Sequence, residues 1–335
     1  MLEIKHPIRE IADASNVSLT PELLCSNSPI VLRGLINDWP LISAAKSSNQ
    51  AAQDYLRDYY NQNKVRTFMA EAKHRGRFFY NDDLNGFNFT PNTTYFDKVL
   101  DDLATYEHLP APPGLYMGST ALDHILPGFR KNNDLSLLVD NPLVSLWVGN
   151  QSRIAAHYDV TDNIACVAAG KRRFTLFPPN QLDNLYIGPL DFTPAGQPAS
   201  LVDFSDPDLV KHPKFAEAMQ HAQVAELEAG DAIFIPSMWW HHVEGLSCFN
   251  VLVNYWWRQV DIQIGAPMDA LNHALLSIRD LPQAQRDAWR NIFEQYIFAP
   301  KDHSYIPEDR RGVLNPIDEQ LARKLRASLV NKLNR

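Results

Sequence analysis

The chain has 335 residues, of which 45% are hydrophobic and 21% charged, and this is the usage of a globular protein long enough to bury a large core. Its formal net charge of −8 argues against broad binding of nucleic acid, because contact with phosphates needs a basic face. No apolar run approaches membrane-spanning length, and no signal peptide is expected at the N-terminus. Three widely separated cysteines without CxxC spacing are typical of a reduced protein, so we expect a cytoplasmic location.

Residues 1–110 mix helix and strand patterns, and we expect an α+β extension that packs on the core of the protein. A helix is predicted at 18–24, where Thr20 is the expected N-cap and Pro21 the first helical residue. The segment 43–63 reads as one helix, while 65–72 and 76–82 read as strands.

Residues 111–260 form a β-rich stretch, in which short apolar segments are broken by Gly, Pro and Asn. This pattern is typical of a jelly roll or barrel. Within it, His157 and Asp159 are two residues apart, so on a strand their side chains would project to the same face. A His-x-Asp sequence also occurs by chance in many proteins, and a lone copy would carry little weight.

A second short segment, 230–245, adds further candidate residues to the pair His157 and Asp159. Gly230 and Asp231 predict a turn, the next residues a short apolar strand, and two tryptophans then precede His241 and His242. Histidines beside tryptophans could belong to an ordinary core, but they would need polar partners there. Together with His157 and Asp159, His241 completes the two-His-one-carboxylate set that binds Fe(II) on one face and leaves three positions open. His242 would point to the other face of a strand and is expected to be a packing residue.

Residues 261–335 turn helical and carry two apolar stripes. The first follows the spacing i, i+3, i+4, i+7, i+8 and comprises Trp289, Ile292, Phe293, Tyr296 and Ile297. The second has a spacing of four and comprises Leu321, Leu325, Leu329 and Leu333. Each stripe either covers the β-core or forms a contact with another molecule.

The order of these motifs resembles a known family. The segments concerned are, in chain order, 29–40, His157 to Asp159, 168–179, 230–245 and 250–257. Together they are similar to the JmjC/cupin-like branch of Fe(II)- and 2-oxoglutarate-dependent oxygenases, and in particular to the asparaginyl hydroxylase that inhibits hypoxia-inducible factor. The resemblance spans roughly 29–260. It implies a mainly β fold with a double-stranded β-helix (jelly roll, cupin) core at 111–260, the N-terminal α+β extension at 1–110 and C-terminal helices at 261–335.

The same resemblance implies a set of residues for the co-substrate 2-oxoglutarate. Asn163 and Asn254 match residues near its iron-chelating end, and Tyr116 and Arg172 match residues at its far carboxylate. The family commonly has lysine at the position of Arg172, so whether Arg172 or Lys171 binds that carboxylate stays open. The relative also has threonine where this chain has Ile154.

The expected function is therefore an oxygenase that decarboxylates 2-oxoglutarate to succinate and CO2 while it hydroxylates a protein or peptide side chain. A small-molecule substrate is the next choice, and hydroxylation is not distinguished from demethylation. The alternatives are a metal-dependent cupin that acts on a metabolite without 2-oxoglutarate and a non-catalytic binding protein of the same fold. The resemblance further implies a homodimer through the C-terminal helices, whereas no membrane and no nucleic-acid partner is expected.

Overall fold

The computed structural model describes residues 6–137 and 141–334, and its first compact unit, which ends at Arg258, contains all the strands named below. Eight consecutive strands of this unit are divided equally between two sheets. They are β8 (Leu143–Gly149), β9 (Arg153–His157), β10 (Asp162–Ala169), β11 (Lys171–Phe177), β12 (Gln223–Glu228), β13 (Ala232–Ile235), β14 (Trp240–Gly245) and β15 (Asn250–Trp257).

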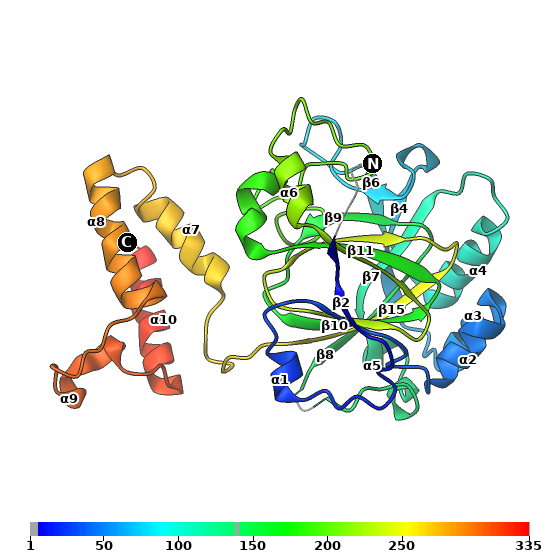
Figure 1. Ribbon diagram of the computed structural model, residues 1–335, viewed down its shortest axis with the longest axis horizontal. Helices are drawn as coiled ribbons and strands as arrows, with labels where there is room; N and C mark the ends of the chain where they lie inside the picture. Colours follow the sequence, from blue (N-terminus) through cyan, green and yellow to red (C-terminus); the bar gives the residue numbers. More distant parts are fainter. Residues whose placement is uncertain (1–5, 138–140, 335) are drawn as a thin grey trace. The chain divides into compact units, whose positions relative to one another are not determined.

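One sheet contains the order β13-β10-β15-β8 and the other β12-β11-β14-β9, with antiparallel pairing throughout each set of four. Figure 1 shows β9 and β11 in one layer and β8, β10 and β15 in the layer below it. Two facing four-stranded antiparallel sets formed in this way are those of a double-stranded β-helix, so the predicted jelly-roll core is confirmed.

Strands from the N-terminal part of the chain extend both sheets. The larger, nine-stranded sheet also contains β2 (Arg9–Ile11), β3 (Ile30–Leu32), β4 (Lys64–Ala70), β6 (Phe89–Tyr95) and β7 (Gly114–Ala121). The smaller, six-stranded sheet also contains β1 (His6–Pro7) and β5 (Arg77–Phe78). Backbone hydrogen bonds between β4 and β7 join the residues before position 110 to those after it within one sheet.

The helices of this unit are short. They are α1 (Pro21–Leu24), α2 (Pro40–Ser47), α3 (Asn49–Arg57), α4 (Phe96–Tyr106), α5 (Leu122–Ile125) and α6 (Phe215–His221), with 3-10 turns η1 (Ala72–His74), η2 (Phe129–Lys131) and η3 (Pro179–Leu185). The helix α1 begins at Pro21 as predicted, although the Thr20 side chain makes no cap hydrogen bond.

The prediction of a single helix at 43–63 is wrong. Ser48 is extended (φ −169°, ψ 163°) and separates α2 from α3. Its hydroxyl accepts a hydrogen bond from the Ala51 amide at 3.0 Å, which is the preferred role of serine at a helix N-cap. Local capping therefore overrides an otherwise uniform helical pattern.

Hydrophobic clusters lie on both sides of the nine-stranded sheet. The largest one packs the outer face of the sheet against α2 to α5, through side chains such as Leu41, Leu56, Leu100 and Ile125. A second one, which includes Val167, Phe174 and Ile233, fills part of the space between the sheets. The rest of that space is lined by polar side chains, and it holds the candidate site.

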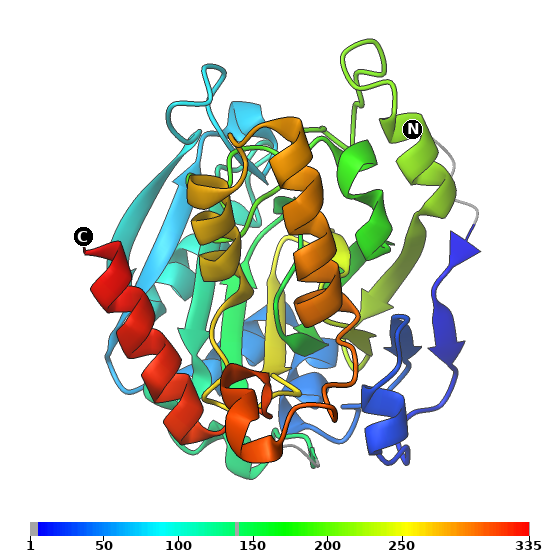
Figure 2. The ribbon, with the colours of Figure 1, turned by 90° about the vertical axis from the view of Figure 1, so that its left-hand side faces the viewer.

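The second unit, Gln259–Arg335, is helical as expected for 261–335. It contains α7 (Pro267–Ser277), α8 (Gln283–Phe293), the π-helical turn η4 (Glu294–Phe298), α9 (Glu308–Arg311), η5 (Gly312–Leu314) and α10 (Glu319–Leu333). Figure 2 shows the three long helices α7, α8 and α10. The only residue buried in these helices is Ala322. Within residues 6–137 and 141–334, no helix has the length and apolar character needed to cross a membrane.

Candidate metal centre

Two neighbouring strands of the six-stranded sheet carry the two histidines. His157 is the last residue of β9, His241 is the second residue of β14, and the two are paired directly across the antiparallel ladder. Asp159 lies beyond the end of β9, in the turn that leads to β10. The expectation that strand alternation alone aligns His157 with Asp159 is therefore wrong, because the strand ends before it reaches the carboxylate.

The turn that carries Asp159 is tied to the turn before β14. The Met238 amide donates to the Asp159 carbonyl at 2.9 Å, and the Ser237 amide donates to Asp162 Oδ1 at 2.9 Å. Met238 has a φ of 69°, in the left-handed region that non-glycine residues seldom adopt. Such conformations persist where the surroundings impose them, and here they bring the two turns together.

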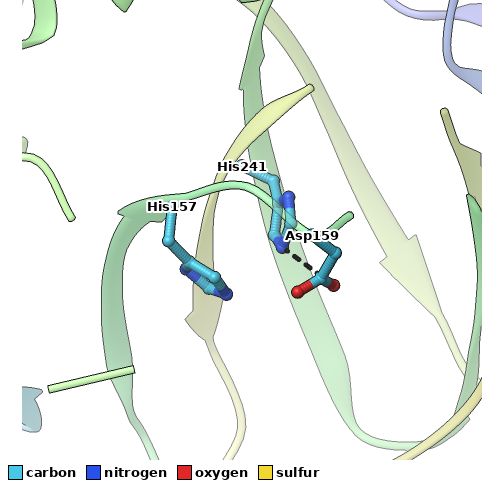
Figure 3. Close-up of side chains that lie close together, drawn as sticks. All are labelled: His157, Asp159 and His241. Carbon is cyan, nitrogen blue, oxygen red and sulfur yellow. Dashed lines mark ion pairs between the residues drawn. The ribbon is translucent and has the colours of Figure 1, made fainter. Parts of the chain in front are cut away.

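Figure 3 shows the three side chains converging. One possible ligand atom from each of His157, Asp159 and His241 lies within 4.8 Å of the others. The distance from Asp159 Oδ2 to His241 Nε2 is 3.8 Å, and the two imidazole centroids are 4.4 Å apart. Two nitrogens and one carboxylate at this separation could hold a single divalent metal ion.

Backbone carbonyls fix which imidazole nitrogen is available. His157 Nδ1 lies 2.9 Å from the Ala155 carbonyl, and His241 Nδ1 lies 3.0 Å from the Trp239 carbonyl. A carbonyl only accepts hydrogen bonds, so each Nδ1 carries the proton and each Nε2 keeps its lone pair for a metal. The arrangement thus makes Nε2 the metal-binding atom of both histidines.

The electrostatics of the site agree with this assignment. Burial, reinforced by the nearby His157, lowers the pKa of His241 to about 4, although Asp159 opposes the shift. His241 is therefore neutral at physiological pH. The Trp256 indole donates to Asp159 Oδ2 at 3.2 Å and orients the carboxylate.

The predicted co-substrate residues share one cavity with the three candidate ligands. A cavity of about 250 Å³ is lined by Tyr116, Asn163, Arg172 and Asn254 together with His157, Asp159 and His241. Asn254 Nδ2 donates to Asn163 Oδ1 at 2.8 Å, whereas the buried Asn254 Oδ1 has no partner among the described residues. An unpaired buried acceptor in a cavity wall is a free contact for a bound molecule.

Arg172 is the most unusual side chain of this cavity. It is only 2% exposed, and its guanidinium makes no hydrogen bond or ion pair with any residue that the structure describes. Burial lowers its pKa, although arginine remains charged. A buried cation without a counter-ion is costly, so this position is suited to an anionic ligand.

The neighbours of Arg172 on β11 behave differently. Lys171 pairs with Glu226 at 3.1 Å and Glu228 at 3.3 Å, and Arg173 pairs with Glu226 at 2.7 Å. Both lie outside the cavity, since alternate residues of a strand face opposite sides. Of the two candidates for the far carboxylate, the structure places Arg172 in the cavity and Lys171 on the outer face.

His242 and Ile154 complete the set of residues considered from the sequence. His242 does not line the cavity, and its ring packs against Phe204 with centroids 4.6 Å apart. Ile154 does line the cavity, where a threonine would offer a hydroxyl.

Sequence reasoning assigned no role to two tryptophans of the site. Trp256 orients Asp159, and Trp147 carries a buried indole N–H without a partner among the described residues. The placement of Trp256 on the same face as Asn254 was a usable signal, because alternation along β15 brings both into the cavity.

Comparison with known proteins gives a consistent family. The model of the cupin-like domain matches residues 17–263. The tRNA wybutosine-synthesizing protein 5 of Mus musculus is 24% identical over an alignment that covers 91% of this chain and 98% of that protein. Shorter matches include the lysine-specific demethylase JMJ31 of Arabidopsis thaliana, 32% identical over 34% of this chain and 21% of that protein. The HSPB1-associated protein 1 of Homo sapiens is 29% identical over 45% of this chain and 31% of its own length.

Proposed function

The chain belongs to the family of proteins with a cupin-like domain, and from this premise we propose that it is an Fe(II)- and 2-oxoglutarate-dependent oxygenase. The observation that carries the proposal is one cavity that combines the His157, Asp159 and His241 ligand set with the buried, unpaired cation of Arg172. A metal site alone would fit several reactions. A metal site beside an unpaired guanidinium fits a co-substrate that has a carboxylate at each end.

The residues present fit the metal. His157 Nε2, His241 Nε2 and one oxygen of Asp159 would hold Fe(II), since both histidines are oriented through Nδ1 and the carboxylate through Trp256. Bound Fe(II) and 2-oxoglutarate together supply the oxidising chemistry, in which O2 is consumed, 2-oxoglutarate becomes succinate and CO2, and a C–H bond is hydroxylated.

The protein contributes binding and orientation. Arg172 would bind the far carboxylate through its forked N–H groups, and the Tyr116 hydroxyl would donate to the same group. Burial raises the pKa of Tyr116, so its hydroxyl stays protonated as a donor. Asn254, whose Oδ1 is unpaired, would contact the chelating end together with Asn163.

Apolar side chains form part of the wall of this cavity. Phe174, Ile235 and Leu252 line it beside the polar groups and belong to the cluster that fills the space between the sheets. A low-dielectric wall strengthens the attraction between Arg172 and a carboxylate. It also limits the access of water to the reacting groups.

The identity of the hydroxylated group is the finer part of the proposal. The names of the relatives refer to a tRNA and to lysine demethylation, so membership of the family does not select a substrate. We retain a protein or peptide side chain as the first candidate, as for the asparaginyl hydroxylase that the motifs resemble. A cytoplasmic homodimer is part of the same proposal.

A binding experiment tests the site before any substrate is known. Titration of the metal-free protein with Mn(II), followed by calorimetry with 2-oxoglutarate, should show metal binding first and co-substrate binding only afterwards. Asp159→Ala should bind neither, whereas Glu228→Ala, which removes an exposed carboxylate outside the cavity, should behave as the unmodified protein. Binding of 2-oxoglutarate that does not depend on metal would contradict the proposed chelation and favour a binding protein of the same fold.

A further inference from the structure

A second cavity opens beside the candidate metal centre. It has a volume of about 410 Å³ and shares His157, Tyr116, Trp147 and Ile154 with the metal cavity. Because His157 belongs to both walls, a molecule seated in this second cavity would lie beside one of the three candidate metal ligands. The cavity is therefore placed to hold the group that is oxidised.

Six aromatic rings line this cavity. They are Phe68, Phe78, Phe87, Phe89, Tyr116 and Trp147. Apart from Trp147 of β8, these rings come from β4, β5, β6, β7 and the segment between β5 and β6, which lie outside the eight-stranded jelly-roll core; β4 and β6 are labelled in Figure 1. We call this second cavity the aromatic pocket. The jelly roll supplies the candidate ligands, and the added strands supply most of the rings of the aromatic pocket.

Several of these rings already stack on one another. Phe87 is nearly parallel to Phe89 (9°, centroids 5.0 Å apart) and to Phe192 (15°, centroids 4.6 Å apart). Tyr116 stacks on Trp147 at 5.7 Å and 29°. Phe68, Phe87 and Phe89 are only half-buried although they lie in a cavity wall, so part of each ring remains available to a ligand. Aromatic pairs prefer offset or edge contacts, which a flat ring can make with several of these faces.

One unpaired cation stands at this pocket. Arg66 is exposed, and its guanidinium lies 5.3 Å from the Phe68 ring centroid. Among residues 6–137 and 141–334 it has no ion-pair partner, and apart from His157 it is the only charged or titratable basic side chain in the wall. A guanidinium beside an aromatic ring can bind an anionic group next to a planar one.

The wall also contains one buried donor. Trp147 Nε1 has no hydrogen-bond partner among the described residues, and Trp147 lines both cavities. An unpaired indole N–H is satisfied by an acceptor atom on a ligand.

From these contacts we infer that the aromatic pocket binds a planar aromatic group that carries a negative charge. The ring packs against the accessible parts of Phe87 and Phe89, the charge pairs with Arg66, and the reacting end points towards His157. The role of this ligand as the oxidised substrate rests on the proposed function, whereas its binding does not. Two sources offer this chemistry, namely an aromatic residue beside an acidic residue in a peptide and a free heteroaromatic anion such as a nucleotide.

Ligand-observed NMR on the metal-free protein tests the inference without any turnover. Phenylacetate should bind, while cyclohexylacetate, which has the same charge but no flat ring, should bind roughly five-fold more weakly. Benzyl alcohol, which has the ring without the charge, should also bind about five-fold more weakly than phenylacetate. Acetyl-Asp-Phe-amide represents the peptide source, and AMP represents the nucleotide source. The compound that represents the natural ligand should bind more tightly than phenylacetate.

Matched variants locate the two contacts. Arg66→Gln should weaken phenylacetate by about five-fold and leave benzyl alcohol unchanged. Lys64→Gln is its control, because Lys64 is a cation on the same strand that does not line the pocket. Phe87→Leu should reduce the preference for phenylacetate over cyclohexylacetate, and circular dichroism should show an intact fold for all three variants.

The outcomes separate this inference from the proposed function. Equal binding of phenylacetate and cyclohexylacetate, or equal effects of Arg66→Gln and Lys64→Gln, would overturn the inference. Metal-dependent formation of succinate by a protein that binds no aromatic anion would also overturn the inference. It would leave the proposal of an oxygenase unaffected. Binding of the aromatic anion by a protein that turns over no 2-oxoglutarate would support the pocket and contradict the oxygenase.

Discussion

The two units of this protein differ in whether their apolar side chains are buried or exposed. The unit that ends at Arg258 contains every residue of the four buried hydrophobic clusters, and among them it keeps polar groups such as the Arg172 guanidinium and Asn254 Oδ1 unpaired. The unit from Gln259 onward buries only Ala322 in its helices. It leaves large apolar side chains such as Leu276, Ile297 and Phe298 exposed.

This difference indicates a division of roles. Unpaired polar groups in a closed core cost free energy and are retained where a ligand satisfies them, so the first unit is suited to chemistry. Unpaired apolar faces on helices are retained where another surface covers them, so the second unit is suited to assembly. Substitutions in one unit should then change activity without changing the oligomer, and substitutions in the other should do the reverse.

The largest effect is expected for Asp159→Ala. Two imidazoles alone hold Fe(II) poorly, so iron-dependent turnover of 2-oxoglutarate should fall by roughly 100-fold or more. The oligomer and the fold should survive, because Asp159 lies in a turn and its removal empties no hydrophobic cluster. Turnover is followed as succinate, and mass is followed by light scattering. Full activity in this variant would refute the assigned ligand set.

A smaller effect is expected for the co-substrate contact. Arg172→Ala should raise the apparent KM for 2-oxoglutarate by about ten- to a hundred-fold while iron affinity changes little, because a charge-assisted bond to one carboxylate is lost. Lys171→Ala is the matched control and should change KM by less than about two-fold, since Lys171 pairs with exposed glutamates. A larger effect from Lys171→Ala would show that the assigned orientation of β11 is wrong.

The second unit should control assembly. We propose a two-fold homodimer through these helices, so light scattering at micromolar concentration should give about twice the monomer mass of 38.1 kDa. Leu325→Glu combined with Leu329→Glu on α10 should shift the protein towards monomer, since a buried charge opposes association. Metal binding should be retained in the monomeric variant. A clean monomer before substitution would instead mean that no second copy covers these faces.

The smallest effect concerns stability without ligand. Arg172→Met replaces a buried unpaired cation with an apolar chain, so the free energy of unfolding of the metal-free protein should rise by about 1–2 kcal/mol. Arg173→Met removes a half-exposed ion pair and should change it by less than about 1 kcal/mol. Urea denaturation without 2-oxoglutarate measures both. A clear loss of stability in Arg172→Met would show that the guanidinium has a partner within the protein.

The short apolar segments predicted the jelly roll, and the family resemblance implied the co-substrate residues that the structure places in one cavity. Arg172 faces inward between Lys171 and Arg173, as the period of two along a strand requires. Asp159 reaches the site by a different route, since its turn is held through Met238 and Ser237, and such long-range hydrogen bonds leave no periodic signal. The break at Ser48 was missed because a serine within a helical pattern reads equally as interior or cap. The aromatic pocket is assembled from strands distant in the chain, and the periodicity of no single segment reveals it.

The central claim is that one cavity couples iron to 2-oxoglutarate. The most direct test incubates the purified protein with Fe(II), O2 and isotope-labelled 2-oxoglutarate, and measures labelled succinate by mass spectrometry. The account predicts succinate that requires both iron and O2, that persists in Glu228→Ala and that is lost in Asp159→Ala. Absence of succinate from an iron-loaded, folded protein that is supplied with candidate peptides and aromatic anions, or formation that is unchanged in Asp159→Ala, would contradict it.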